Sequence, residues 1–154
     1  MPTTRPTSSG NQVTVRHLRQ DDHDLLVSVE EGLFDEPVIP SEAAHFLADP
    51  GHHMVVALDG DTVVAMASAT VVRHPDKPPE LFINEVGTRD DHQRRGLATR
   101  LVKALIEWAR AAGHKGIWLA TEEGNAPSRG LYGKLGARET GGVVVYDWDG
   151  AMDD

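Results

Sequence analysis

The sequence predicts a mixed α/β fold, and three features carry this prediction. Short apolar runs that alternate with polar residues are separated by segments with helical periodicity, a pattern typical of a sheet covered by helices. The dipeptide Asp59-Gly60 stands between two apolar runs and is typical of a β-hairpin turn. The segment from Leu97 to Ala112 carries an apolar face wide enough to lie against a sheet.

Local signals place the individual elements. Asp21-Asp22 can start a helix that continues to about Glu31, and Pro50-Gly51 ends a shorter helix that begins at Ser41. The expected elements are strands at residues 13–16, 53–58, 62–72, 81–88, 116–121 and 143–148, and helices at about 22–31, 41–49, 97–112 and 127–135. In chain order they run β-α-α-β-β-β-α-β-α-β.

Length and composition limit the organisation of the chain. With 154 residues, 40% of them hydrophobic, the chain can bury one core but is too short for two ordinary domains. We expect one domain over residues 13–150, preceded by a disordered tail over residues 1–12 that is rich in Pro, Thr and Ser. Because no segment is apolar enough for a signal peptide or a membrane span, we expect a cytoplasmic protein.

Composition also excludes some kinds of chemistry. The sequence has no cysteine, so disulfides, thiolate metal sites and an acyl-cysteine intermediate are excluded. The eight histidines are scattered without metal-ligand spacing, and we expect no metal site. A formal net charge of −9 disfavours nucleic acid and anionic membranes as partners.

The hexapeptide Gln93 to Ala98 is the most informative segment. It lies between an apolar strand and a helix, where the first helical N–H groups lack partners and the helix dipole is positive, an arrangement suited to a pyrophosphate. Gly96 allows close backbone approach, and Arg94 and Arg95 add positive charge. Neither a dinucleotide fingerprint nor a nucleoside-triphosphate loop is present. Taken alone, the hexapeptide is as typical of an ordinary capped helix start as it is of a phosphate-binding loop.

Its neighbours identify a family. The chain resembles the GNAT superfamily of acyl-CoA-dependent N-acyltransferases in three segments that occur in the expected order: the acidic strand 81–88, the loop 93–98, and the Asn, Leu-Tyr, Lys-x-Gly pattern in 125–137. Within the superfamily it looks like the small aminoglycoside 3-N-acetyltransferases, through residues 33–37, 132–139 and 146–149. The resemblance implies acetyl-CoA as donor and coenzyme A as product. It also implies a mostly antiparallel sheet with helices on both faces and two central parallel strands that splay around the cofactor.

The resemblance implies two catalytic residues. Glu85, which interrupts an apolar strand, would be the general base, and partial burial would raise its pKa toward the working pH. Tyr132 would give a proton to the leaving sulfur. The alternatives are a solvated or Arg-paired Glu85 at a strand end and a Tyr132 whose ring lies in the core.

The resemblance also implies a set of cofactor-binding residues. Main-chain groups of the acidic strand would hold pantetheine as an added strand does, and the loop would hold the pyrophosphate. Asn125 would bind pantetheine amides, or would simply cap the helix before Pro127. The full set is Val86, Gly87, Thr88, Gln93, Arg94, Arg95, Gly96, Leu97, Ala98, Thr99, Asn125 and Ser128.

The distribution of charge predicts the acceptor. No Lys or Arg occurs between Gln20 and Val72, whereas basic residues gather around the loop, at Arg89, Arg94, Arg95, Arg100 and Lys103. An acidic half suits a cationic amine, and we expect Asp35, Glu36, Asp147 and Asp149 to contact it. The resemblance to the 3-N enzymes implies that this amine is an aminoglycoside, acetylated at the 3-amino position. A polyamine, another small amine or a protein amine stays open, as do a non-catalytic acyl-CoA sensor and a homodimer.

Overall fold

The computed structural model describes residues 12–149 of the chain. Two compact units make up the chain: an N-terminal unit, Met1–Ala120, and a C-terminal unit, Thr121–Asp154. The tail expected over residues 1–12 lies outside the described residues apart from Gln12. The expectation of one domain over residues 13–150 stays a prediction.

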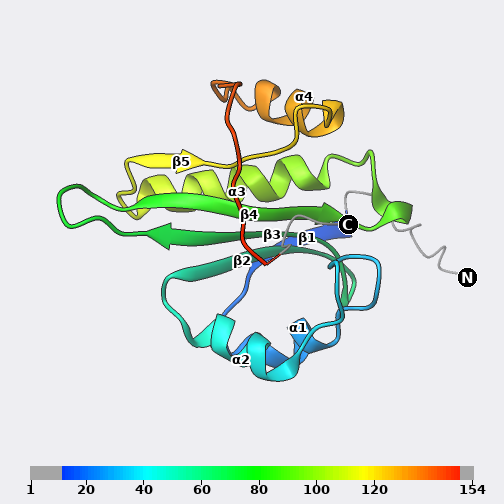
Figure 1. Cartoon of the computed structure of the whole chain (residues 1–154). Helices are drawn as coiled ribbons and strands as arrows, with labels where there is room; N and C mark the ends of the chain where they lie inside the picture. Colours follow the sequence, from blue (N-terminus) through cyan, green and yellow to red (C-terminus); the bar gives the residue numbers. More distant parts are fainter. Residues whose placement is uncertain (1–11, 150–154) are drawn as a thin grey trace, which may run out of the picture. The chain divides into compact units, whose positions relative to one another are not determined.

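The N-terminal unit is built on a five-stranded sheet with the strands in chain order (Figure 1). The pairs β1·β2, β2·β3 and β3·β4 are antiparallel, and β4·β5 is parallel. The strands are β1 Val13–His17, β2 His52–Asp59, β3 Thr62–Val72, β4 Glu80–Thr88 and β5 Gly116–Trp118. The predicted mixed, mostly antiparallel sheet is therefore confirmed.

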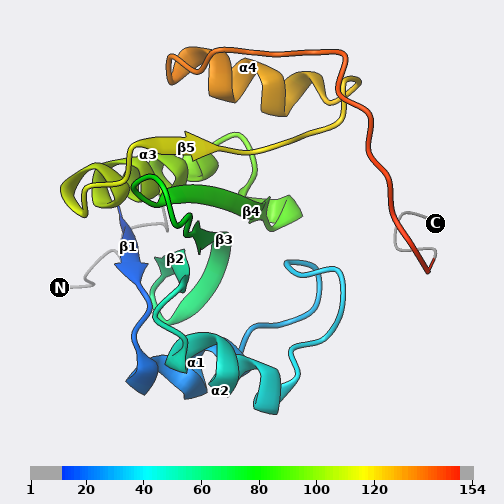
Figure 2. The same cartoon turned by 60° about the vertical axis from the view of Figure 1, so that its left-hand side comes forward.

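Helices cover both faces of this sheet, as expected. Two turned views show α1 and α2 on one face and α3 on the other (Figures 1 and 2). The helices are α1 His23–Val27, α2 Pro40–Ala48 and α3 Leu97–Ala111, with short 3-10 turns η2 Gln20–Asp22 and η3 Asp90–His92. α3 buries the stripe predicted from its periodicity, including Leu101 and Leu105, which are fully buried.

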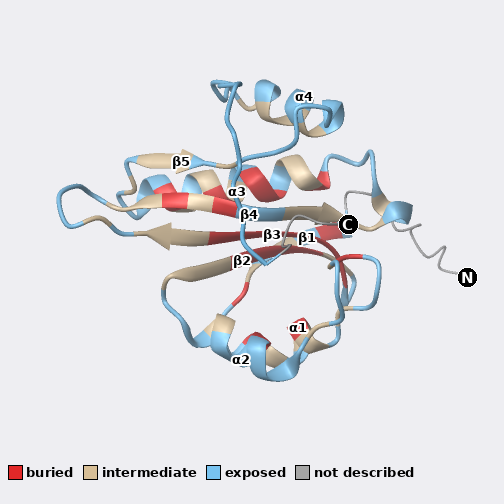
Figure 3. Cartoon of the chain, viewed as in Figure 1, coloured by how far each residue is buried: buried red, intermediate tan, exposed pale blue. Residues whose placement is uncertain are grey.

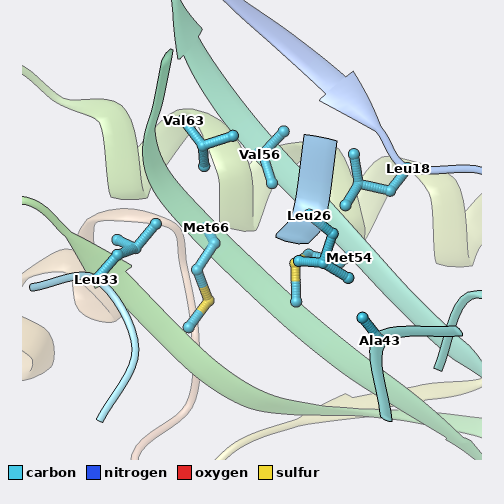
Figure 4. Packing of buried hydrophobic residues seen from close by; sticks show 8 residues of the cluster. All are labelled: Leu18, Leu26, Leu33, Ala43, Met54, Val56, Val63 and Met66. Carbon is cyan, nitrogen blue, oxygen red and sulfur yellow. The ribbon is translucent and has the colours of Figure 1, made fainter. Parts of the chain in front are cut away.

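Burial is concentrated in the middle of the sheet, along β2, β3 and the first half of β4 (Figure 3). On the α1/α2 face, Met54, Val56 and Met66 pack with Leu26 and Leu33, which come from α1 and the loop that follows it (Figure 4). Burying a side chain of this size stabilises the fold by about 1.5–3 kcal/mol. The loop between α1 and α2 is thus fixed to the sheet by its own apolar residues.

The first helix is shorter than predicted, because α1 ends at Val27 and not near Glu31. The Ser28 hydroxyl donates a 2.6 Å hydrogen bond to the Leu25 carbonyl, an alternative to the continuing helical ladder. The chain then leaves the helix to place Leu33 on the sheet. Tertiary packing has overridden local propensity here.

The parallel strands separate after a short contact. β4 and β5 pair only at Glu80↔Gly116, Leu81↔Ile117 and Phe82↔Trp118. β5 then ends, while β4 continues to Thr88 and pairs with β3 alone among the described residues. The expected separation of the two parallel strands is confirmed, although β5 is the edge strand of the described sheet and not a central one.

The C-terminal unit contains one described helix, α4, Ala126–Lys134. Arg129 fastens the segment after the helix to its start, with bonds of 2.7 and 3.0 Å to the Glu139 carboxylate and 2.8 Å to the Glu123 carbonyl. The strand predicted at residues 143–148 is absent, and these residues are exposed without regular structure. A strand needs a ladder partner, and the described part of this unit holds no other strand.

Candidate active site

A β-bulge in β4 positions Glu85. Ser68 of β3 pairs with Glu85 and Ala69 pairs with Ile83, so Asn84 is an extra residue in β4. Asn84 is held in place, since its side-chain amide donates to the Thr70 hydroxyl at 2.7 Å. Ser68 lies on the same face of β3 as Met66, so Glu85 lies on the α1/α2 face of the sheet.

The surroundings of Glu85 favour its protonated form. Although the residue is exposed, nearby protein displaces water from its carboxylate and raises its pKa, and the negative charge of Asp35 raises this pKa further. The fold thus brings together two predicted site residues that are far apart in the sequence. A carboxyl group with a raised pKa suits proton transfer near neutral pH.

Two contacts hold the Asp35 loop against the C-terminal half of β4. A Cβ at Gly87 would lie 3.3 Å from the Leu33 carbonyl oxygen, so the absence of a side chain allows the loop to approach the strand closely. Arg89, which follows β4, donates to the Glu31 carbonyl at 3.2 Å and lies 4.0 Å from the Glu30 carboxylate. The loop is therefore fixed to the end of β4 at two points.

A cavity of about 150 Å³ lies within this loop. Its lining combines apolar side chains with carboxylates: Val27, Val29, Glu30, Glu31, Phe34, Glu36, Pro37 and Val38. The predicted acceptor residue Glu36 is thus at the cavity, on the same loop as Asp35. An acidic cavity of this size can take a cationic group.

The predicted cofactor loop has the geometry that a pyrophosphate needs. Gly96 precedes α3 with a left-handed backbone (φ 72°), no side chain caps the helix, and a Cβ on Gly96 would meet nothing within 4 Å. Open space therefore surrounds the Cβ position of Gly96, directly before the first helical N–H groups, which are not capped by a side chain. Arg94 and Arg95 are exposed beside it. The residues present fit the phosphates of coenzyme A.

His92 ties the start of the cofactor loop to the sheet. Its Nε2 lies 3.0 Å from the Asp59 carboxylate at the end of β2, and its Nδ1 lies 2.8 Å from the Asp91 carboxylate. The bond to Asp59 is the largest cause of a raised His92 pKa, followed by the bond to Asp91, while burial and Arg95 oppose them. Next to it, the Gln93 amide donates to the Asp90 carboxylate at 3.3 Å.

The remaining predicted cofactor residues of the N-terminal unit fall into two groups. Val86, Gly87 and Thr88 pair with β3 on one side and have no strand on the other among the described residues, so backbone groups there can take an extended ligand. Leu97, Ala98 and Thr99 form the first turn of α3. Of the basic residues expected near the loop, Arg100 donates instead to the Val13 carbonyl at 3.1 Å.

The other predicted site residues belong to the C-terminal unit. Burial raises the pKa of Tyr132, which keeps its phenol protonated. Asn125 caps α4, since its side chain accepts from the Ser128 backbone N–H at 3.2 Å; this is the alternative role that the sequence allowed. Asp147 and Asp149 are exposed after the helix. The fold of the N-terminal unit does not itself bring these residues to Glu85.

Sequence reasoning missed three structural parts of the site: the bulge at Asn84, the Arg89 contacts to the loop, and the His92–Asp59 pair. The bulge and the pair depend on strand register, which one sequence does not display. Arg89 was recognised as basic, but its partner lies 58 positions away in the chain. Asn84, a residue depleted in strands, was the one available signal of an irregularity.

Residues 14–137 match the model of the acetyltransferase (GNAT) family. The chain belongs to this family, and it is an N-acetyltransferase that uses acetyl-CoA.

In the described part of the chain no helix is long and apolar enough to cross a membrane, and no cluster of potential metal ligands is found.

Two curated relatives differ in the acceptor that their names state. The N-alpha-acetyltransferase RimI of Mycobacterium tuberculosis is 29% identical over 138 residues, which cover 88% of this chain and 84% of that protein. The aminoglycoside N(6')-acetyltransferase type 1 of Serratia marcescens is 32% identical over 112 residues, which cover 69% of this chain and 76% of that protein.

Solved structures confirm the fold. An aminoglycoside acetyltransferase from an uncultured soil metagenomic sample, in complex with sisomicin, has a TM-score of 0.77 at 15% identity, over 90% of this chain and 98% of its own. Aminoglycoside N-acetyltransferase AAC(6')-Iy in complex with CoA has a TM-score of 0.75 at 19% identity, over 94% and 99%. The expected likeness to 3-N enzymes needs correction, because the aminoglycoside enzymes whose names give a position are of the 6' type.

Proposed function

We propose that this enzyme acetylates an amine of an aminoglycoside, at the 6' position. The observation that carries the proposal is that the acidic loop with Asp35 lies against β4 on the face of the sheet that carries Glu85, where the Leu33 carbonyl closely approaches Gly87. Two carboxylates on one face can attract an ammonium group, and one of them can then accept a proton from it. The relative from Serratia marcescens supports the 6' position.

In the proposed reaction the amine attacks the acetyl group directly. Bound acetyl-CoA supplies the thioester, and the reaction forms a C–N bond while the C–S bond breaks. Glu85 accepts the proton that the amine loses. The raised pKa of Glu85 lies closer to the pKa of the amine than an ordinary carboxyl pKa does. Tyr132 donates a proton to the departing sulfur and recovers one from solvent.

The same proposal assigns the binding residues. The free backbone edge at Val86 to Thr88 holds pantetheine, and the loop from Gln93 through Thr99 holds the pyrophosphate. Asn125 and Ser128 complete the cofactor site. Asp35 and Glu36 pair with the remaining ammonium groups of the acceptor, together with Asp147 and Asp149. Catalysis in the cytoplasm and a homodimer stay predictions.

A second candidate acceptor is the N-terminal amine of a protein. It is favoured by the match to RimI, which covers more of this chain than the aminoglycoside relative does. The acidic loop favours the aminoglycoside. A protein N-terminus brings one ammonium group, which needs a single carboxylate partner, whereas several carboxylates line the cavity of this loop.

A thiol-release assay with acetyl-CoA distinguishes the candidates. The panel contains sisomicin, spermidine, methionine sulfoximine and a peptide that begins with alanine. We expect the highest kcat/KM with sisomicin and an NMR spectrum that places the acetyl group on the 6' nitrogen. Turnover of the peptide alone would replace the aminoglycoside with a protein amine. Binding of acetyl-CoA without thiol release from any amine would favour the sensor.

A further inference from the structure

The bulge at Asn84 changes which residues share a face with Glu85. Phe82 and Glu85 are three positions apart, so in a regular strand their side chains would lie on opposite faces. Here Phe82 pairs with Thr70 and Glu85 pairs with Ser68, two positions apart on β3 and therefore on one face. The extra residue thus places an aromatic ring and the candidate base on the same side of the sheet.

Trp118 extends this aromatic surface across the parallel strands. It pairs in register with Phe82, and the two ring centroids are 4.3 Å apart with the planes inclined by 40°. Trp118 is the last residue of β5 and stands where the two strands separate. Its residue surface is 50% exposed, so a large indole faces solvent beside the point where the sheet opens.

Charge indicates what such a surface binds. Glu85 lies on the same face, and Asp35 is near enough to act on the Glu85 carboxylate. An indole face attracts cations, and it also packs against the C–H groups of a saturated ring. Aromatic surface beside carboxylates therefore suits a ring that carries ammonium groups. A purely apolar ligand would leave the carboxylates without partners.

We propose that Trp118, supported by Phe82, is a platform that binds an amine-bearing ring of the acceptor next to Glu85. The proposal rests on the proposed function and makes it more specific, since it names a residue that separates ring-bearing polyamines from linear ones. Phe82 fixes the indole through the ring contact, and the indole contacts the substrate. Neither residue takes part in proton transfer.

Two substitutions at Trp118 test the platform. Trp118→Leu keeps an apolar side chain and removes the aromatic face, whereas Trp118→Phe keeps an aromatic face. We expect Trp118→Leu to raise the KM for sisomicin about threefold to thirtyfold, the range for a cation over an aromatic ring. Trp118→Phe should restore most of the affinity. The KM for acetyl-CoA and the kcat at saturating acceptor should stay close to those of the wild type.

The matched measurements use a linear amine and a remote tryptophan. The KM for spermidine should change less than the KM for sisomicin, and Trp108→Phe, on α3 at the opposite face of the sheet, should change neither. An unchanged sisomicin KM in Trp118→Leu would overturn the platform, as would equal effects of Leu and Phe or an equal rise in the acetyl-CoA KM. If the wild type turns over no aminoglycoside, the proposed function fails instead. The same variants are then measured with the amine that is turned over, and an unchanged KM for that amine would reject the platform separately.

Discussion

At the residue scale, Glu85 combines exposure with a raised pKa, so its substitution should affect chemistry more than folding. We predict that Glu85→Gln lowers kcat about 100-fold or more, the usual contribution of a general base. The acetyl-CoA KM should stay nearly unchanged, because little volume is removed. Initial rates by thiol release measure both constants.

The pH dependence of kcat/KM distinguishes a general base from a structural residue at position 85. A base with a raised pKa is protonated and inactive below that pKa, so wild-type kcat/KM for the acceptor should rise as pH increases through it. In Glu85→Gln the rise of kcat/KM at the Glu85 pKa should disappear. At higher pH the rate of the variant should increase as free amine becomes available, so the ratio of the wild-type rate to the variant rate should become smaller there. Glu107→Gln, at an exposed position of α3, is the matched control. A defect of equal size at every pH would indicate a structural role for Glu85.

Tyr132 provides the second residue-scale prediction. Burial raises its pKa, so the phenol keeps its proton over the whole working range. Tyr132→Phe removes the hydroxyl alone and should lower kcat about tenfold or more, with a smaller effect on either KM. Single-turnover thiol release measures the chemical step directly. Wild-type rates in this variant would rule out the phenol as the sole proton donor.

The sequence predicted the identity of the candidate residues better than their partners. Glu85 could be found because a carboxylate interrupts an apolar strand, and Gly96 because a glycine stands between a strand and a helix. The electrostatic effect of Asp35 on Glu85 depends on how a loop packs, and the His92–Asp59 pair joins residues 33 positions apart. Such long-range pairs follow from register and packing, which local patterns do not encode.

At the scale of elements, the start of α3 makes a steric prediction. Because Gly96 has φ 72°, any other residue there is strained by about 1–2 kcal/mol, and its Cβ would project into the open space beside the proposed phosphate site. We predict that Gly96→Val raises the acetyl-CoA KM about tenfold or more with a smaller change in the acceptor KM.

The opposite end of the helix supplies the control for this change. Gly113 also has a positive φ (84°) and open space around a Cβ, so Gly113→Val carries a similar backbone cost. Thermal unfolding should show comparable losses of stability in the two variants. The increase in donor KM should occur in Gly96→Val alone, and an unchanged donor KM there would reject the assignment of the phosphate site.

The η3 turn before α3 predicts a pH-dependent stability. Because the Asp59 and Asp91 carboxylates raise the pKa of His92, its stabilising effect is complete below the unfolded pKa of about 6.5 and is lost as pH rises through the folded value. The hydrogen bond to the largely buried Asp59 carboxylate contributes about 1.5–3 kcal/mol. We therefore predict that His92→Gln lowers Tm most at weakly acidic pH, and that the difference from wild type shrinks above the raised pKa.

The acetyl-CoA KM provides the functional readout for this turn. It should rise in His92→Gln, since η3 leads directly into the cofactor loop. Asp59→Asn removes the partner from the other side and should reproduce the same pH dependence of Tm. A Tm difference that stays constant between pH 5 and pH 9 would show that the His92 proton does not contribute.

The elements themselves were predicted unevenly, and the reason is physical. The hairpin and α3 were correct because turn chemistry and a wide apolar face are local signals. The predicted length of α1 and the predicted strand at residues 143–148 were wrong. In the first case packing of Leu33 ends the helix early, and in the second the apolar alternation has no ladder partner in its own unit. Local patterns describe what a segment can form, while partners decide whether it forms.

At the scale of the whole molecule, the sequence predicted the class of fold because the order of elements restricts the topology. A hairpin and one crossover helix leave few ways to build a mixed sheet. The uneven charge was also visible, with no Lys or Arg between Gln20 and Val72. The structure gives this asymmetry a location, since the acidic residues Glu30, Glu31 and Glu36 line one cavity.

That acidic surface predicts how the enzyme responds to salt. Exposed carboxylates attract a polycation through a field that 0.15 M salt screens beyond about 8 Å, so the sisomicin KM should climb with ionic strength while kcat changes less. Replacing Asp35 and Glu36 together by Asn and Gln should raise the sisomicin KM at low salt and flatten its salt dependence. A replacement of Glu42 and Asp49, exposed at α2 and its end, should leave the slope nearly unchanged. Initial rates between 20 mM and 500 mM KCl measure these slopes, and an unaltered slope in the Asp35 and Glu36 variant would place the acceptor away from this loop.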